Sequence, residues 1–115
     1  MKTLIRHESL STDEKEMLRR CKRIISACDP TAEIILYGSR ARGDAEAGSD
    51  YDLLILTDRE ATLESEDMMR RHLYPLELEE GSVLTVFLVS KAEWNSPLYG
   101  AMPFYQNVQK DGISL

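Results

Sequence analysis

Two aspartates have the residue type and spacing best suited to chemistry. Asp50 and Asp52 stand two apart at the start of an apolar run, and because side chains alternate along a strand, both project from one face. Two carboxylates that close repel each other unless a cation lies between them. Mg²⁺ or Mn²⁺ is the natural partner, because hard divalent cations prefer oxygen ligands and Mg²⁺ keeps open positions for substrate phosphates. The pair therefore predicts a metal site that acts on a phosphorylated substrate.

A glycine–serine pair upstream supplies the other half of such a site. Gly38 follows an apolar run, and a glycine there lets another group approach the backbone closely. The amides that follow, at the start of a helical turn, form an anion site, to which the Ser39 hydroxyl adds a donor. Arg40 and Arg42 can contact phosphate oxygens. These four residues predict a nucleotide site in which a metal-bound triphosphate lies between their donors and the carboxylates.

The joint pattern carries this interpretation, because each half alone has an ordinary alternative. An isolated Asp-x-Asp is usually a solvated strand end, and an isolated Gly-Ser is usually a turn. Here ten residues separate Ser39 from Asp50, with one apolar strand before the glycine and another after the first aspartate. At average residue usage the four fixed positions should recur by chance in roughly one chain in a thousand of this length. The combination therefore favours a functional site.

Three short apolar runs predict the strands that must position these residues. They cover 33–37, 50–56 and 83–90. A capping box at 11–14 begins a helix that ends at Asp29-Pro30, and its apolar positions follow a 3-4-3-4 spacing. Further helices are expected over 59–73, ending or restarting at Tyr74-Pro75, over 91–94 and over 103–112, with a loop at 95–100. The order α-β-β-α-β-α predicts an α/β (α+β) fold with a small mixed sheet flanked by helices.

The length and charge limit the class of protein. With 115 residues, 43% of them hydrophobic, the chain is expected to form one domain over residues 1–115. A formal net charge of −6 argues against direct binding of duplex nucleic acid. The sequence opens on no signal-peptide pattern and holds no bilayer-length apolar run, so we expect a cytoplasmic protein that does not contact a membrane. Cys21 and Cys28 share the apolar face of the first helix and are expected to be small buried hydrophobes.

These residues closely resemble the nucleotidyltransferase superfamily that includes DNA polymerase beta, in particular its minimal nucleotidyltransferase (MNT) branch. The diagnostic GSxARG…SDxD element is present at 38–43 and 49–52. The resemblance implies the polymerase beta-like fold and transfer of a nucleoside monophosphate from an NTP, expected to be ATP, to a hydroxyl, with release of pyrophosphate. It also implies that Asp50 and Asp52 are the catalytic residues and bind two metal ions. Gly38 and Ser39 would hold the β- and γ-phosphates, and Arg42 would support the loop or the phosphates.

The same resemblance implies a protein partner. Stand-alone MNT proteins often act as antitoxins of HEPN-domain ribonucleases, sometimes by adenylylating the toxin. The acceptor hydroxyl is accordingly expected on a HEPN-type partner protein or on a small molecule. The sequence is also compatible with a homo-oligomer. The alternative is a catalytically weak or inactive nucleotide-binding protein that neutralises a toxin by forming a complex with it.

The sequence departs from the family pattern on the third strand. Active members usually carry a third carboxylate there, whereas 83–90 contains no acid. Alternation assigns that place to Thr85 or Phe87, and neither can usefully take a proton. The acids just before this strand (Glu77, Glu79 and Glu80) are expected to form a solvated helix end. Either the activity is weak, or the acceptor or a partner supplies the base, or the domain binds nucleotide without transferring it.

The remaining candidate residues have structural interpretations. His7 and His72 lie in polar segments and are expected at the surface. Trp94, Tyr99, Phe104 and Tyr105 are expected to dock the tail helix on the sheet, in preference to forming a partner-binding patch.

Overall fold

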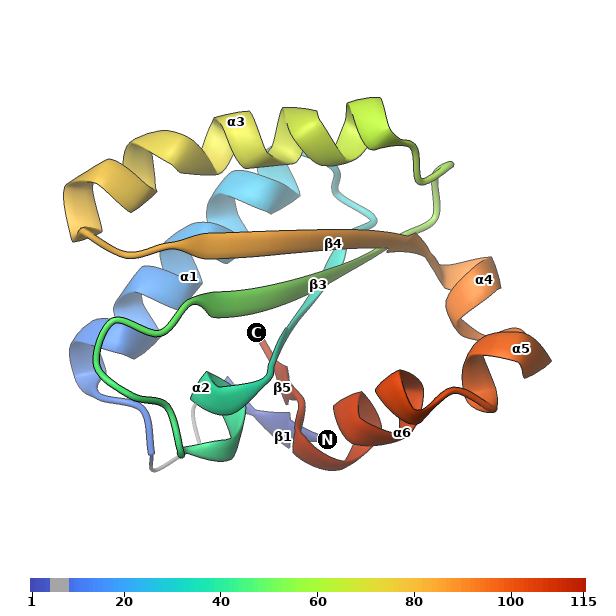
Figure 1. Cartoon of the computed structure of the whole chain (residues 1–115). Helices are drawn as coiled ribbons and strands as arrows, with labels where there is room; N and C mark the ends of the chain where they lie inside the picture. Colours follow the sequence, from blue (N-terminus) through green and yellow to red (C-terminus); the bar gives the residue numbers. More distant parts are fainter. Residues whose placement is uncertain (5–8) are drawn as a thin grey trace.

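A mixed five-stranded sheet separates two layers of helices in the computed structural model, which describes residues 1–4 and 9–115 (Figure 1). The strands are β1 (Lys2–Thr3), β2 (Glu33–Tyr37), β3 (Tyr51–Thr57), β4 (Leu84–Ser90) and β5 (Ile113–Ser114), in the spatial order β1-β5-β2-β3-β4. The helices are α1 (Thr12–Cys28), α2 (Ser39–Arg42), α3 (Leu63–Glu80), α4 (Lys91–Trp94), α5 (Pro97–Gly100) and α6 (Pro103–Asp111). Helices α1 and α3 cover one face of the sheet, and α4 to α6 lie on the other. The predicted fold class is therefore confirmed.

The pairing of the central strands decides which side chains meet. Strand β2 runs antiparallel to β3 with Tyr37 opposite Asp52, and β3 runs parallel to β4 with Asp52 opposite Thr85. These three residues form one row across the sheet, on the face that carries α6. Strands β1 and β5 extend the sheet beyond β2. At two residues each they are too short for a periodic pattern, so the sequence did not predict them.

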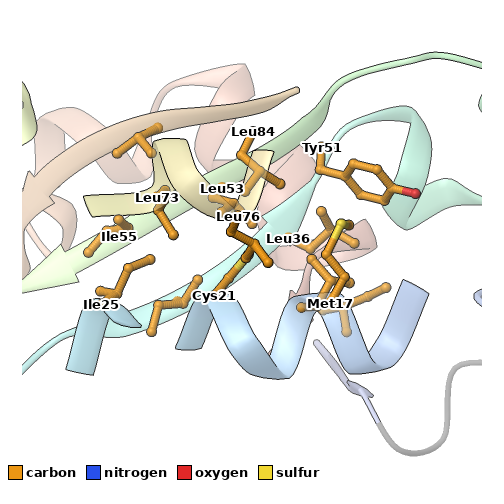
Figure 2. Packing of buried hydrophobic residues seen from close by; sticks show 14 of the residues in the cluster. Met17, Cys21, Ile25, Leu36, Tyr51, Leu53, Ile55, Leu73, Leu76 and Leu84 are labelled. Atoms are coloured by element: carbon orange, nitrogen blue, oxygen red, sulfur yellow. The ribbon is translucent and has the colours of Figure 1, made fainter. Parts of the chain in front are cut away.

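The larger core lies between α1, α3 and the sheet. Helix α1 begins at the predicted capping box, in which Glu14 N–H donates to Ser11 Oγ (3.1 Å) and Ser11 N–H donates to Glu14 Oε1 (3.0 Å). Figure 2 shows the apolar stripe of α1, with Met17, Cys21 and Ile25, facing side chains of α3 and the sheet. The facing side chains include Leu73 and Leu76 of α3 and Leu36, Leu53 and Ile55 of the sheet. Burial raises the pKa of the Cys21 thiol to about 12, so it behaves as an apolar side chain. Cys28 is only half-buried, and both cysteines are free.

Helix α3 runs unbroken through Pro75, so the predicted break at Tyr74-Pro75 is wrong. A proline inside a helix removes one N–H donor and crowds the preceding turn. Leu73 and Leu76, on either side of Pro75, are both buried in the core, and this packing holds the helix across the missing hydrogen bond. The helix also begins later than expected, where the Thr62 hydroxyl accepts from Ser65 N–H (3.0 Å).

Side chains of α3 satisfy the outer edge of β4. Two edge N–H groups donate to carboxylates and one edge carbonyl accepts from an arginine: Leu84 N–H to Glu77 Oε2 (3.0 Å), Leu88 N–H to Glu66 Oε2 (3.0 Å), and Arg70 Nη2 to Val86 O (3.1 Å). Glu77 thus belongs to the sheet edge, contrary to the expected solvated helix end, whereas Glu79 and Glu80 pair with Arg20 nearer the surface (2.6 and 3.1 Å). Because open edges invite pairing with another chain, these contacts protect β4 from it.

The second face of the sheet carries an aromatic cluster. Trp94 packs against Tyr99, Phe104 and Tyr105 with ring centroids 4.8 to 5.9 Å apart, so the expected docking of the tail helix is confirmed. The segment 95–100, expected to be a loop, contains α5 instead, because Ser96 caps the turn and Pro97 occupies its first position. Among the residues described, no helix has the length and apolar character needed to cross a membrane.

Candidate active site

The residues of the predicted site meet at one end of the sheet, where β2 ends and β3 begins. Gly38 follows β2 directly and precedes the single turn of α2. Tyr51 begins β3 with its side chain in the core between α1 and α3, only 5% exposed. Because side chains alternate along β3, Asp52 is directed to the opposite face. The Asp52 carboxylate therefore lies on the face that carries α6, and Asp50 is exposed just before the strand begins.

Gly38 and Asp52 are in close contact. A Cβ on Gly38 would lie 2.5 Å from Asp52 Oδ2, which is nearer than real Cβ atoms approach an oxygen. The backbone of Gly38 has φ 77° and ψ −159°, a conformation essentially restricted to glycine. Only glycine therefore lets the Asp52 carboxylate lie against the turn that begins α2.

The turn of α2 presents donors at the same place. The Gly38 carbonyl accepts the N–H groups of Ala41 and Arg42 (both 3.1 Å), which leaves the N–H groups of Ser39 and Arg40 as the first donors of the turn. Within residues 1–4 and 9–115, neither the amide nor the hydroxyl of Ser39 donates a hydrogen bond. Ala41 is buried and anchors the turn in the core. Arg42 is about half exposed, and its Nε lies 3.3 Å from Asp44 Oδ2.

Arg40 ties α2 to the segment before β3. Its Nε and Nη2 both donate to the Ser49 carbonyl (3.2 and 3.0 Å), and its guanidinium carbon lies 4.5 Å from the centroid of the Tyr51 ring. Its Nη1 lies 3.6 Å from Glu14 Oε2, which also accepts the Tyr51 hydroxyl (2.8 Å). Arg40 is thus a clamp on the residues that flank Asp50. Its guanidinium donors are engaged by the protein rather than directed to the amides that begin α2.

Burial and the contacts among Arg40, Glu14 and Tyr51 together shift the pKa values of Glu14 and Tyr51 in opposite directions. Burial, reinforced by the hydrogen bond to Glu14, raises the pKa of Tyr51 to about 12. Burial alone would raise the pKa of Glu14, but hydrogen bonds from Ser11 and Tyr51, together with the charge of Arg40, outweigh it and lower that pKa. The sequence marks Glu14 only as a capping residue. Its contact with Tyr51, 37 positions away, has no signal in the sequence.

The carboxylates of Asp50 and Asp52 suit a metal ion that completes its coordination shell with water and substrate. In the part of the chain that the structure describes, no group of three or more His, Cys, Asp or Glu side chains could hold a metal. Two carboxylates nevertheless suit Mg²⁺, which proteins often hold by one or two carboxylates while water and substrate phosphates complete the shell. Asp50 is exposed and Asp52 is partly exposed, so both are open to such a substrate.

Thr85 lies beside Asp52 on the neighbouring strand. Its hydroxyl donates to Asp52 Oδ1 (2.6 Å), so one carboxylate oxygen is oriented by Thr85 while the other lies against Gly38. Phe87 pairs with Leu54 one row further along β4, and its ring lies 5.7 Å from that of Phe104. Strand β4, which carries no acid, thus places a hydroxyl against Asp52.

A cavity of about 230 Å³ adjoins Gly38 between the end of β2 and α6. It is lined by Tyr37, Gly38, Arg42, Phe104, Asn107, Val108 and Asp111. Burial, followed by the negative charges of Asp52 and Glu66, raises the pKa of Tyr37, so its hydroxyl is protonated at neutral pH.

Of the two histidines, His72 is exposed on α3 with Nδ1 2.8 Å from the Met68 carbonyl oxygen, and His7 lies outside the described residues.

A glycine turn that lies against a strand aspartate on a mixed sheet suits an enzyme that moves nucleotidyl groups. The sequence profile of the nucleotidyltransferase domain family matches residues 15–108, most of the chain. The chain belongs to this family, and the polymerase beta-like superfamily expected from its motif is confirmed. Members transfer nucleotidyl groups and typically use a nucleoside triphosphate and a divalent metal ion.

The solved structures agree with the fold. The chain is similar to an inferred nucleotidyltransferase from Sulfolobus solfataricus, with a TM-score of 0.58 and 18% sequence identity. The match covers 86% of this chain and 76% of that one. At this identity the likeness concerns the fold alone. The curated proteins contain no match to the chain.

Proposed function

We propose that residues 1–115 act as a single minimal nucleotidyltransferase domain, which transfers the nucleoside monophosphate of ATP or another NTP to a hydroxyl. The contact between Gly38 and Asp52 carries this proposal. It brings an anion-binding turn and a carboxylate suited to a metal against each other, which is the arrangement that a metal-bound triphosphate needs. A turn and a strand end without such a role have no need for this approach.

The residues of the turn bind the phosphates. The amide and hydroxyl of Ser39 hold the β- and γ-phosphates, and Gly38 allows their close approach to the backbone. Arg42, which reaches the cavity beside Gly38, balances the charge of the phosphates. Arg40 acts one step away as a positioning residue, because its guanidinium holds the Ser49 carbonyl and so fixes the segment that leads to Asp50.

The carboxylates hold the metal ions. Asp50 and Asp52 bind Mg²⁺ or Mn²⁺, which when bound neutralise charge at the reacting phosphate and at the leaving oxygen. Thr85 and Gly38 orient the two oxygens of Asp52 for this purpose. Most of the rate enhancement then comes from positioning and charge neutralisation, as in phosphoryl transfer generally.

The transfer step needs an acceptor and a base. The acceptor oxygen forms a bond to the α-phosphorus, and the bond from that phosphorus to the oxygen bridging to the β-phosphate breaks, which releases pyrophosphate. Thr85 cannot accept the hydroxyl proton, so the acceptor or its protein supplies the base. We therefore propose a hydroxyl on a partner protein, with a HEPN-domain toxin as the first candidate from the sequence resemblance, ahead of a small molecule. An NTP donor and two free cysteines favour the cytoplasm as the place of reaction.

A second candidate function rests on Thr85. Because a hydroxyl occupies the place beside Asp52 where active relatives usually carry an acid, the domain could bind nucleotide without transferring it and neutralise a toxin by forming a complex. The two candidate functions differ in whether the nucleoside monophosphate becomes covalently attached to the partner.

Label transfer from an NTP separates these candidates. The protein is incubated with Mg²⁺ and NTPs labelled at the α-phosphate, with and without the product of the neighbouring gene. The proposal expects label on that product, and expects its loss in Asp52→Asn but not in the control Asp67→Asn, an exposed aspartate on α3. A stable complex that forms without label, and that survives Asp52→Asn, would favour the binding function instead.

A further inference from the structure

The cavity beside Gly38 adjoins the proposed phosphate site and shares Gly38 and Arg42 with it, while its other walls take no part in that site. Gly38 and Arg42 form its wall on the side of the phosphate-binding turn, and Tyr37 comes from the end of β2. The opposite wall is made by α6, through Phe104 and the residues one and two turns after it. A group joined to a triphosphate on the turn would therefore have this cavity within reach, on the side away from Thr85.

The walls of the cavity combine aromatic rings with polar side chains. The rings of Tyr37 and Phe104 meet edge to face, with centroids 5.2 Å apart. Asn107 and Asp111 stand four residues apart on α6, so both present their side chains on one face of the helix. Within residues 1–4 and 9–115, neither of these two side chains has a hydrogen bond or an ion pair. A ligand that is flat and carries N–H donors at its edge would satisfy both kinds of wall.

We propose that this cavity binds the nucleobase of the NTP and selects a base that carries an exocyclic amino group. The proposal rests on the proposed function, since it places the base relative to phosphates held at Gly38 and Ser39. The ring of the base packs against Tyr37 and Phe104, since stacking on aromatic side chains accepts any base. Asp111 accepts the amino N–H, and Asn107 offers a donor and an acceptor to the adjacent ring nitrogen or oxygen.

The size and charge of the cavity favour a base over the other groups present in the reaction. Its volume of about 230 Å³ lies below the roughly 300 to 1,000 Å³ of sites that enclose drug-sized ligands. It therefore suits one ring system better than a peptide or an oligosaccharide. The Asp111 carboxylate repels phosphate, so the triphosphate is directed to the turn while the base enters the cavity. A carboxylate also disfavours uracil, whose ring N–H stands between two carbonyl oxygens.

Matched pairs of nucleotides test this selection. Binding to the whole protein in Mg²⁺ is measured by calorimetry for CTP against UTP, and for ATP against the triphosphate of purine riboside, which lacks the amino group. We expect the amino-bearing member of each pair to bind about tenfold to a hundredfold more tightly, the range for a hydrogen bond to a charged group. Asp111→Asn should bring both ratios towards one. Lys110→Leu, an exposed change next to it on α6, should leave them unchanged.

Inorganic tripolyphosphate separates this inference from the proposed function. If tripolyphosphate and all NTPs fail to bind, the phosphate site itself is wrong. If tripolyphosphate binds while the nucleotides within each pair bind equally, or Asp111→Asn leaves the ratios unchanged, the phosphate site stands and the base site is refuted. Asn107→Leu gives a second check, because it should weaken ATP binding and leave tripolyphosphate binding intact. An Asn107→Leu protein that lost affinity for the acceptor but not for ATP would assign the cavity to the acceptor and overturn the inference.

Discussion

Replacing Gly38 with alanine should damage both the fold and the nucleotide site. The new Cβ would lie 2.5 Å from Asp52 Oδ2, so the carboxylate oxygen must retreat by about 0.5 Å to reach the 3.0 Å below which real Cβ contacts essentially do not occur. Asp52 cannot retreat freely, because Thr85 holds its other oxygen by a 2.6 Å hydrogen bond. The backbone adds strain, because φ 77° with ψ −159° is essentially a glycine conformation.

These contributions set the expected magnitude. A residue other than glycine in this conformation costs about 1–3 kcal/mol. Weakening the hydrogen bond from Thr85 to a carboxylate costs about 1–2 kcal/mol more. We therefore expect Gly38→Ala to lower the free energy of unfolding by about 2–5 kcal/mol, measured by urea denaturation. In protein that stays folded, the displaced Asp52 should also weaken binding of NTP with Mg²⁺.

Gly81 offers a matched control. It also has a positive φ, 66°, but a Cβ there would meet nothing within 4 Å. Gly81→Ala should therefore cost about 1 kcal/mol from backbone strain alone and leave NTP binding unchanged. The reasoning is refuted if the two variants unfold within about 0.5 kcal/mol of each other and bind NTP equally.

Three further changes test other contacts of the site and the fold. Arg40→Lys keeps the charge but loses the paired donors to Ser49 and the stacking on Tyr51, so it should lower the free energy of unfolding by about 1–2 kcal/mol and speed amide exchange at 49–51; unchanged exchange there would contradict the clamp. Thr85→Asp places a carboxylate against Asp52, so its melting temperature should fall without metal and rise with added Mg²⁺ more than that of the wild type; an equal response to Mg²⁺ would argue against a metal beside Asp52. Burial would raise the pKa of Asp29, but hydrogen bonds from Thr57 and Thr31 and the charge of Arg59 outweigh it and lower that pKa from 3.8. Ionised Asp29 therefore stabilises the fold above pH 3.8, and this contribution is lost as the pH falls through the lowered pKa. Asp29→Asn should flatten the acid limb of stability against pH, and parallel acid limbs would count against this.

The sequence predicted the central elements of the fold because each has a local cause. The capping box at Ser11 and the 3-4-3-4 stripe define α1, and three apolar runs define β2, β3 and β4. The break at Pro75 was predicted wrongly because proline chemistry is local, whereas the packing of Leu73 and Leu76 that overrides it is tertiary. Strands β1 and β5 are held by pairing with distant residues, and two residues carry no period.

The same division holds at the candidate site. Alternation along β3 was sufficient to place Asp52 on the face that carries α6, and a glycine after β2 was sufficient to predict a close approach. Asp50 lies just before the strand, so its place on the same face stays a prediction. The sequence could not show that the approaching group is the Asp52 carboxylate. Nor could it show that Arg40 is held by the Ser49 carbonyl, because each contact joins elements that only the sheet register brings together.

The cavity beside Gly38 had no sequence signal at all. Its walls come from β2, α2 and α6, and the spacing of Asn107 and Asp111 on α6 is ordinary for a solvated helix face. What distinguishes these two residues is the cavity that they line, and its shape depends on how the aromatic cluster packs α6 against the sheet.

A crystal structure with Mn²⁺ and an NTP analogue that resists cleavage between the α- and β-phosphates tests the proposed site most directly. We expect anomalous signal from Mn²⁺ at ligand distance from the carboxylates of Asp50 and Asp52, with the β- and γ-phosphates on the amide and hydroxyl of Ser39. Mn²⁺ absent from both carboxylates, or a triphosphate bound away from the Gly38 turn, would contradict the assignment of this site.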